Sequence, residues 1–470
     1  MNLPADFITS INLLLGAEAE DFLASLKENA PVSVRFNPFK IKRNPIEFSL
    51  QTEQVLWSEF GYYLNNRPTF TFDPLFHSGY YYVQEASSMF IEHVVKQLID
   101  GPINCLDLCA APGGKSTSLL SSLPEGSLLV SNEIIRQRAN ILSETMIKFG
   151  QPNSVVTNNN PKDFAAIPDF FDLILVDAPC SGEGMFRKDE VAINEWSVDN
   201  VRMCASRQKN ILSDVWSSLK PGGYLLLSTC TYNTSENENN AWWAISELGA
   251  EFIEVDIDLA WGITKSYNDK VNAYRFFPHK TKGEGLFVTV IKKNGTNVLS
   301  HQSTLSLKNS KKNKKYFSPF IKESSYYEVL INNYSNYDYV DFENRIVALP
   351  KDHSSTLLSL KEKFKVVSMG IELGVRKGKD FIPSHALAMS NDLNLRAFFR
   401  YELSYNDAIA FLRSEAITIH DAPKGLVLIT FKNEPMGFVK NLGSRANNLY
   451  PNEWRIRSGY LPQSPIFIFK

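Results

Sequence analysis

The chain has 470 residues, of which 44% are hydrophobic and 21% are charged, a balance typical of globular proteins. This composition excludes a disordered, collagen-like or coiled-coil chain, and the length predicts about three domains. The 49 Lys and Arg residues against 51 Asp and Glu residues give a net charge of −2. No global positive field would therefore draw the protein to nucleic acid, and such a partner would have to be bound by local patches.

The sequence contains no apolar run of the roughly 18 residues that cross a bilayer, and no N-terminal stretch typical of a secretion signal. The expected compartment is therefore the cytoplasm. An odd number of cysteines without a CxxC pair argues against a secreted disulfide framework and against a structural zinc site, so we expect no metal. The five cysteines are Cys105, Cys109, Cys180, Cys204 and Cys230. Their clustering in one stretch suggests thiol chemistry.

Residues 1–84 are expected to form an N-terminal domain that binds RNA. Leucines and Phe22 recur at helical spacing near the start, which predicts helix as far as about residue 75. An alternating, extended run over residues 33–38 interrupts this pattern. The domain is thus predicted to be a small α+β unit.

Residues 85–293 alternate between short apolar runs and helical segments. Strands are expected at 104–108, 127–133, 154–157, 171–177 and 224–228, with two more near 252–255 and 285–291. Helices are expected over 134–149 and 207–219. Near-continuous apolar strands separated by helices are typical of a parallel sheet that is buried on both faces. We therefore predict an α/β fold with a seven-stranded, mostly parallel sheet.

The last third of the chain is expected to begin with a basic linker, residues 294–320. Its basic side chains, Lys311, Lys312, Lys314 and Lys315, belong either to a solvated tether or to one that contacts phosphates. Apolar runs at 366–371 and 425–431 predict strands of small β-rich modules. We expect a first C-terminal domain over residues 321–390 and a second over residues 391–470.

A glycine loop in residues 106–116, LDLCAAPGGKS, lies between the first expected strand and a helix expected to start near Ser116. Gly113 and Gly114 lack a Cβ, so the backbone can approach a ligand there, and the N–H groups of the helix start point at that ligand. The spacing is not that of a P-loop, because Cys109 stands where a glycine is required, and the dinucleotide motif GxGxxG is absent. The looser glycine loop of S-adenosylmethionine (SAM) enzymes fits.

An acidic residue, Glu133, ends the second expected strand. A carboxylate there is placed to accept hydrogen bonds from both ribose hydroxyls of a nucleoside. Taken alone, an acidic residue at a strand end is usually only solvated. Its position after the glycine loop favours the ligand contact.

Two cysteines follow neighbouring strands, Cys180 within VDAPCSGEG and Cys230 within LSTCTYN. They should face one cleft with the glycine loop beside them. A thiolate that adds at C6 of a pyrimidine makes C5 able to accept a methyl group from SAM, and a second thiol can assist breakdown of the adduct. Asp177 is placed to bond the N3/N4 edge of cytosine, where protonation at N3 would drain the added charge. The alternative target, an exocyclic amine, is expected with an Asn/Asp-Pro-Pro-aromatic turn, which residues 178–180 do not match.

Together these segments resemble the Nop/Sun family of SAM-dependent RNA cytosine-C5 methyltransferases, and within it the F type that acts on bacterial 16S rRNA. The resemblance covers nearly the whole chain and includes the C-terminal runs 383–388 and 447–457. It implies a class I, Rossmann-like methyltransferase domain and a C-terminal PUA-like RNA-binding module. It also implies that Cys230 is the nucleophile and that Cys180 releases the product.

The resemblance further implies a set of SAM contacts from the glycine loop and the strand ends. These are Cys109, Ala110, Ala111, Pro112, Gly113, Gly114, Lys115, Glu133 and Asp177. One position departs from the family, which usually has Asp after the third strand to contact the adenine amine; this chain has Asn160. The amide oxygen can still accept a hydrogen bond, so we expect weaker SAM binding rather than none.

The candidate RNA contacts are Arg35, Arg187, Lys188 and Arg275, although each alone is also explained as a solvated surface charge. The near-neutral net charge suggests a structured partner such as the 30S subunit, and we expect a monomer. Two alternatives stay open. The same chemistry would also suit tRNA, and a catalytically impaired relative would act as an RNA-binding ribosome assembly factor.

Overall fold

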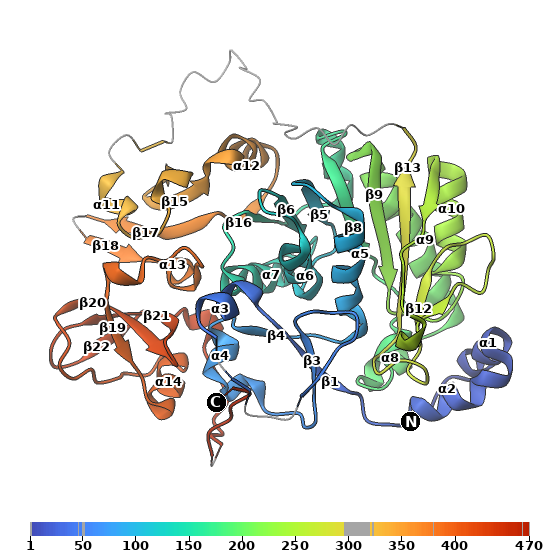
Figure 1. The fold of residues 1–470 in the computed structure, drawn as a ribbon, viewed down its shortest axis with the longest axis horizontal. Helices are drawn as coiled ribbons and strands as arrows, with labels where there is room; N and C mark the ends of the chain where they lie inside the picture. Colours follow the sequence, from blue (N-terminus) through green and yellow to red (C-terminus); the bar gives the residue numbers. More distant parts are fainter. Residues whose placement is uncertain are drawn as a thin grey trace.

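The computed structural model describes residues 2–45, 47–48, 52–295, 320–321, 324–378, 380–462 and 464–469. The predicted basic run with Lys311, Lys312, Lys314 and Lys315 lies outside these residues. Figure 1 shows the largest sheet at the centre, the N-terminal strands below it and the C-terminal sheets to one side.

A ten-stranded mixed sheet forms the centre, in the order β11-β12-β13-β9-β8-β5-β6-β7-β16, with β10 paired to β13. Its strands are β5 (Asn104–Asp107), β6 (Leu128–Asn132), β7 (Ser154–Thr157), β8 (Phe171–Asp177), β9 (Leu219–Thr229), β10 (Ala250–Ile253), β11 (Thr264–Lys265), β12 (Tyr274–Phe276), β13 (Leu286–Lys293) and β16 (Val366–Met369). Strands β5 to β9 are parallel, and β13 is antiparallel to β9. All seven predicted strands are present, but the predicted number was wrong because β11, β12 and β16 extend the edges.

Helices cover both faces of this sheet (Figure 1). The helices of this region are α5 (Phe90–Leu98), α6 (Gly114–Ser122), α7 (Arg136–Phe149), α8 (Glu190–Glu195), α9 (Val198–Trp216) and α10 (Glu238–Leu248). Leu129 of β6 packs in the layer with α5, α6 and α7, whereas its neighbours Leu128 and Val130 pack in the layer with α9 and α10. This alternation explains why the strands are apolar throughout, since both faces are buried.

The N-terminal region divides into two parts. In a four-stranded antiparallel sheet, β2-β3-β1-β4, strand β1 confirms the extended run predicted over residues 33–38, whereas β2 and β3 hold residues that were wrongly predicted to be helical. The elements are α1 (Ala5–Leu15), α2 (Ala19–Ser25), β1 (Val32–Phe36), α3 (Pro38–Arg43), β2 (Thr52–Gln54), β3 (Gly61–Leu64), α4 (Pro74–His77) and β4 (Tyr81–Val83). Helices α1 and α2 lie apart from this sheet in Figure 1. Their apolar side chains, among them Phe7 and Phe22, pack with Trp196, Tyr232 and Phe277 of the catalytic region.

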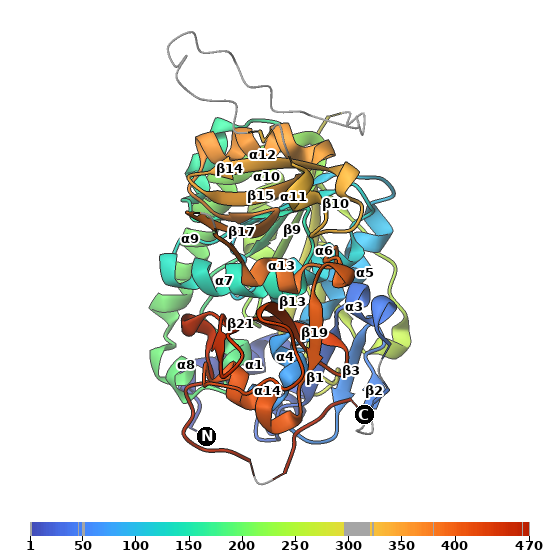
Figure 2. The same ribbon diagram turned by 90° about the vertical axis from the view of Figure 1, so that its left-hand side faces the viewer.

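Two further four-stranded sheets form the C-terminal part, with α13 between them in Figure 2. The elements are α11 (Ser325–Glu328), β14 (Tyr337–Phe342), β15 (Arg345–Pro350), α12 (Lys351–Lys363), β17 (Ile371–Lys377), β18 (Asp380–Pro383), α13 (His385–Met389), β19 (Phe399–Glu402), α14 (Tyr405–Leu412), β20 (Gly425–Phe431), β21 (Glu434–Asn441) and β22 (Ala446–Asn448). The second sheet contains the predicted strand at 425–431. None of the helices within the described ranges is long and apolar enough to cross a lipid bilayer.

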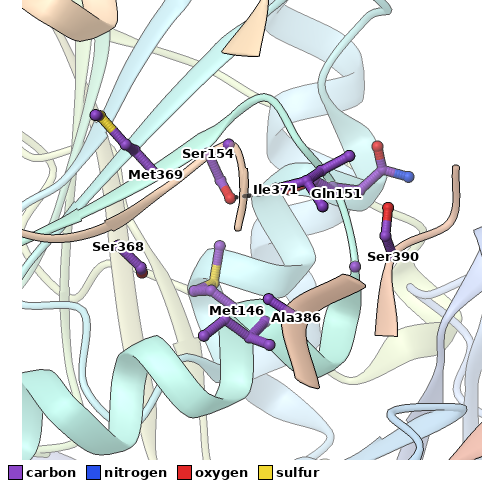
Figure 3. Close-up of a pocket in the computed structure, with 11 residues that line it drawn as sticks. Met146, Gln151, Ser154, Ser368, Met369, Ile371, Ala386 and Ser390 are labelled. Carbon is purple, nitrogen blue, oxygen red and sulfur yellow. Dashed lines mark hydrogen bonds between the residues drawn. The ribbon is translucent and has the colours of Figure 1, made fainter. Parts of the chain in front are cut away.

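The predicted domain at residues 321–390 is not self-contained. Its strand β16 pairs antiparallel with β7 and so extends the catalytic sheet. A cavity of about 30 Å³ remains at this junction, lined from both sides by residues such as Met146 and Ala386 (Figure 3). A larger cavity of about 650 Å³ lies at the same junction, so the packing there is incomplete, although the central sheet and this C-terminal part share a core.

The last sheet packs against the N-terminal one and buries charge at the contact. Lys40 of α3 lies 3.5 Å from the carboxylate of Glu434, and Arg43 forms a second ion pair with the same carboxylate. The side chains of Lys40 and Glu434 are 1% and 0% exposed. Burial lowers the pKa of Lys40 to about 8, and Glu434 partly offsets that effect.

Glu434→Gln is expected to lower the free energy of unfolding by about 3 kcal/mol, because it leaves a buried ammonium without its counter-charge. Urea denaturation followed by circular dichroism would measure the change. The matched control is Glu415→Gln, which removes an exposed carboxylate paired with Arg413 and should change stability by less than about 0.5 kcal/mol. Equal, small changes in both variants would contradict this account of the contact.

Candidate active site

The glycine loop lies where β5 ends and α6 begins. Gly113 has φ 113°, a left-handed conformation, and caps α6, which starts at Gly114 rather than at the predicted Ser116. A Cβ at position 113 would lie 2.8 Å from Thr145, and one at position 114 would lie 3.0 Å from Tyr82. The loop therefore requires glycine for its conformation at the first position and for space at both.

Asp107, at the end of β5, was not singled out from the sequence, although an acidic residue just before a glycine loop was an available signal. It is fully buried, and its Oδ2 accepts a hydrogen bond of 2.6 Å from Ser116. Its Oδ1 has no hydrogen-bond partner among the described residues. Burial raises the pKa of Asp107 to about 7, and the nearby Asp177 adds to the rise. An orphaned buried carboxylate oxygen beside a glycine loop fits a ligand that carries an ammonium group and hydroxyl groups, as SAM does.

Glu133 directly follows β6, which ends one residue earlier than predicted, and it is 2% exposed. Its Oε1 accepts a hydrogen bond of 2.9 Å from the N–H of Ile135, and its Oε2 lies 3.3 Å from Arg138. Arg138 also donates to the carbonyl of Ala111 at 2.8 Å, so it ties Glu133 to the glycine loop. No sequence signal pointed to Arg138, because its role depends on where α7 crosses the loop.

Asn160 follows β7 and caps the 3₁₀ helix Pro161–Ala166. Its side-chain oxygen accepts from the N–H of Lys162 at 3.2 Å, and its own N–H donates to Asp163 at 3.0 Å. The cap uses one of the two acceptor positions of the amide oxygen. The adenine contact predicted for Asn160 stays a prediction, and it would use the second acceptor position of this oxygen.

The two cysteines meet at the ends of β8 and β9. The Sγ atoms of Cys180 and Cys230 are 3.1 Å apart, and both cysteines are free thiols. The hydrogen bond to Cys230, followed by burial, raises the pKa of Cys180 well above its ordinary value. The raised pKa favours the protonated form of Cys180, and either sulfur can donate in this contact.

An ion pair lies beside the thiols. Lys115 Nζ is 2.9 Å from Asp177 Oδ2, and Ser228 donates to Asp177 Oδ1 at 2.8 Å. Burial lowers the pKa of Lys115. The negative charge of Asp177 and the Cys230 sulfur both raise it, and together the raising effects outweigh burial, so the pKa lies above its ordinary value. Lys115 therefore carries its charge, and its ion pair joins the glycine loop to Asp177.

Two predicted RNA contacts were wrong, because Arg35 and Arg275 are each only 1% exposed. Arg275 forms a buried ion pair with Glu238 and donates to the carbonyl of Tyr232 at 2.7 Å. Arg35 donates to Gln84 at 2.7 Å and to side chains of α6. Their donors are used inside the protein, where they hold the loop after Cys230 and helix α6.

The remaining two predicted RNA contacts lie in different environments. The side chain of Arg187 is 4% exposed and lies 2.9 Å from Glu284, so the RNA contact predicted for it is also wrong. The side chain of Lys188 is 32% exposed and lies 3.3 Å from the same carboxylate. Lys188 is thus the one of the four predicted residues that reaches the surface.

No group of three His, Cys, Asp or Glu side chains suited to a metal ion occurs in the part of the chain that the structure describes. The arrangement consists of a glycine loop with an orphaned carboxylate, two sulfurs in contact, and an ion pair. It can bind a nucleoside-like ligand and present a sulfur nucleophile next to a carboxylate and an ammonium group.

Two solved structures share the fold over 61% and 62% of the chain. A methyltransferase homologue from Pyrococcus horikoshii is 25% identical with a TM-score of 0.52, and the alignment covers 61% of this chain and 94% of that one. The structure of NSun6 from Pyrococcus horikoshii with SFG is 19% identical with a TM-score of 0.52, over 62% of this chain and 99% of that one.

Sequence comparisons cover the whole chain. Residues 100–292 match the family described as 16S rRNA methyltransferase RsmB/F, residues 3–86 match the N-terminal domain of 16S rRNA methyltransferase RsmF, and residues 398–456 match the methyltransferase RsmF PUA domain. Two curated relatives are named ribosomal RNA small subunit methyltransferase F. The one from Shigella boydii is 30% identical over 94% of each chain, and the one from Pectobacterium atrosepticum is 29% identical over 99% of this chain and 98% of its own. The chain therefore belongs to the 16S rRNA methyltransferase RsmB/F family.

Proposed function

We propose that this chain is a SAM-dependent methyltransferase that makes 5-methylcytosine in 16S rRNA, with Cys230 as the nucleophile. The observation that carries the proposal is the contact of 3.1 Å between the sulfurs of Cys180 and Cys230, next to the Asp177–Lys115 pair. Relatives named ribosomal RNA small subunit methyltransferase F support the rRNA substrate.

The substrate chemistry explains why a sulfur nucleophile is needed. Cytosine C5 is too weak a nucleophile to take a methyl group directly. A bond from the Cys230 thiolate to C6 gives C5 enolate-like character, so that C5 can take the methyl group that SAM would supply. A base then removes the C5 proton, and expulsion of the thiolate restores the ring. Cys180 assists breakdown of this adduct.

Asp177 and Lys115 match the polar edge of the base. The N4 amino group of cytosine is a hydrogen-bond donor, which suits the carboxylate of Asp177. Its N3 is an acceptor, which suits the ammonium group of Lys115. The Nζ of Lys115 and the Oδ2 of Asp177 are 2.9 Å apart. A proton held near N3 offsets the negative charge that the ring gains when sulfur adds at C6. The ion pair therefore both orients the base and stabilises the adduct.

SAM supplies the methyl group as a sulfonium. Residues Cys109 to Lys115 of the glycine loop would hold the SAM molecule. Glu133 would bind its ribose, and Asn160 would bind its adenine. The orphaned oxygen of Asp107 gives a further contact within the same loop.

The RNA side of the proposal rests on the C-terminal module. Residues 398–456, which match a PUA domain, would bind rRNA together with Lys188, and the target base must be unpaired or flipped to reach the sulfurs. We further propose that the substrate is the 30S subunit or its precursor in the cytoplasm, and that the enzyme acts as a monomer.

The test is capture of the covalent adduct. Cys180→Ala, incubated with SAM and rRNA, should accumulate a protein–RNA band that survives denaturation, because the addition step stays intact while breakdown is impaired. The band should disappear in the Cys180→Ala, Cys230→Ala double variant. A comparison of naked 16S rRNA with 30S particles identifies the substrate. A folded Cys180→Ala protein that gives no band with either one would refute the proposal.

A further inference from the structure

The loops that carry the two sulfurs are bound to each other by two buried carboxylates, each reaching across to the opposite loop. We name them the Cys180 loop (residues 178–185) and the Cys230 loop (residues 230–237). Glu183 of the Cys180 loop accepts from the N–H groups of Tyr232 and Asn233, at 2.6 and 3.0 Å. Glu236 of the Cys230 loop accepts from the N–H of Ser181 at 3.0 Å and from its hydroxyl.

Further uncharged side chains donate hydrogen bonds to both carboxylates. Gln208 of α9 and Asn233 donate to Glu236 at 2.9 and 2.8 Å. Trp196 and the side chain of Asn233 donate to Glu183 at 3.0 and 2.9 Å. Glu183 and Glu236 are 1% and 0% exposed, so each charge acts in a medium of low dielectric constant. Such a charge influences its neighbours more strongly than one on the surface.

The charges around the thiol pair are distributed unevenly. Glu236 binds the residue next to Cys180, and its carboxylate contributes to the raised pKa of that thiol, after the bond to Cys230 and burial. Lys115 interacts electrostatically with Cys230, which contributes to the raised pKa of the ammonium group. The remaining charges are Asp177, paired to Lys115, and Glu183, which faces the backbone of the Cys230 loop. A negative charge disfavours a thiolate next to it, and a positive charge favours one.

We propose that Glu236 is a positioning residue that keeps Cys180 as the protonated thiol of the pair and so leaves Cys230 as the sulfur that attacks. The two sulfurs end neighbouring parallel strands and are 3.1 Å apart, so strand position alone does not choose between them. The buried carboxylate that acts on Cys180 and the ammonium that interacts with Cys230 make that choice. The inference rests on the proposed function for the attack itself, but the difference in protonation belongs to the free protein.

Alkylation of the two cysteines as a function of pH tests this without SAM or RNA. Limited iodoacetamide labelling, with mass spectrometry of the separate tryptic peptides, gives one pH profile for each thiol. In the wild-type protein the midpoint for Cys180 should lie at least about one pH unit above that for Cys230, which is about a tenfold difference in thiolate population. Coincident profiles in the wild-type protein would overturn the proposal whether or not any variant folds.

The variants separate charge from structure. Glu236→Gln should lower the Cys180 midpoint by about one unit, so that labelling at a fixed pH rises about tenfold. Glu236→Asp keeps the charge and should restore the wild-type profile. Ser181→Ala removes one hydrogen bond but leaves the carboxylate, and should change the Cys180 rate by less than about twofold, a shift of less than about 0.3 pH unit. An unchanged Cys180 profile in folded Glu236→Gln, or an equal shift in Ser181→Ala, would refute the role of the charge.

This result is separable from the test of the proposed function. If the two thiol profiles differ as expected but adduct capture fails, the proposed role of Glu236 is supported and the proposed cytosine chemistry is refuted. If adducts form on Cys230 while the two profiles coincide, the chemistry stands and Glu236 has no such role.

Discussion

Replacing Cys230 with alanine is expected to lower the rate of methyl transfer by about 10⁴-fold or more, on the scale of other removed nucleophiles. Without sulfur addition at C6, cytosine C5 cannot attack a methyl donor, and the raised pKa of Cys180 disfavours a thiolate at the neighbouring sulfur. Transfer of labelled methyl groups from SAM to 30S particles measures the loss. The affinity for SAM should change by less than about threefold, a difference under 1 kcal/mol, because Cys230 is not part of the glycine loop.

Cys204→Ala is the matched control for this substitution. Cys204 is a buried thiol on α9 that is 4% exposed and lies outside the site. Its replacement should leave the methyl-transfer rate within about twofold of the wild-type rate, since that is a barrier difference of less than 0.5 kcal/mol. Residual transfer above one hundredth of the wild-type rate in folded Cys230→Ala would contradict the nucleophile assignment.

Asp177→Asn is expected to lower kcat/KM for RNA by about 10³-fold, within the range found for acid–base groups. The amide keeps the shape of the side chain and can keep the bond from Ser228, but it removes the negative charge that pairs with Lys115. The base would lose its carboxylate acceptor at N4, and the ammonium would lose the partner that orients it.

Steady-state kinetics with saturating SAM measure this effect, and Asp199→Asn serves as its control. The Asp199 side chain is 91% exposed and pairs only with Arg202 among the described ion pairs. Its neutralisation should leave kcat/KM within about twofold, as expected for a surface pair of this kind. A loss of less than tenfold in Asp177→Asn would show that the cytosine edge is bound by other groups.

Local patterns along the chain were sufficient to predict the central fold. Apolar runs separated by helices predicted the parallel strands, and the glycines at 113 and 114 predicted the loop between β5 and α6. The meeting of Cys180 and Cys230 also followed from the chain, because parallel strands that neighbour each other end at the same edge of a sheet. The structure brings their sulfurs into contact.

Charged residues were predicted less well. A sequence does not show whether an arginine ends at the surface or inside, and Arg35, Arg187 and Arg275 each proved to be enclosed with partners from distant segments. Arg275, for example, is paired with a glutamate 37 residues away. Pairs of this kind depend on which elements pack together, and no local spacing predicts them.

The sequence by itself determined the chemistry that this chain carries, namely two cysteines, Asp177 and a glycine loop, because reactive groups must stand at fixed positions relative to strand ends. Tertiary structure alone decided how those groups are charged and held. It left one oxygen of Asp107 without a partner, extended the catalytic sheet with β16, and packed α1 and α2 against the catalytic region that carries Tyr232. It also bound the carboxylate of Glu236 to Ser181, the residue next to Cys180, and brought the ammonium of Lys115 within electrostatic reach of Cys230. The reason is that the pKa and reach of a side chain depend on burial and on neighbours from other elements, and these exist only once the chain has folded.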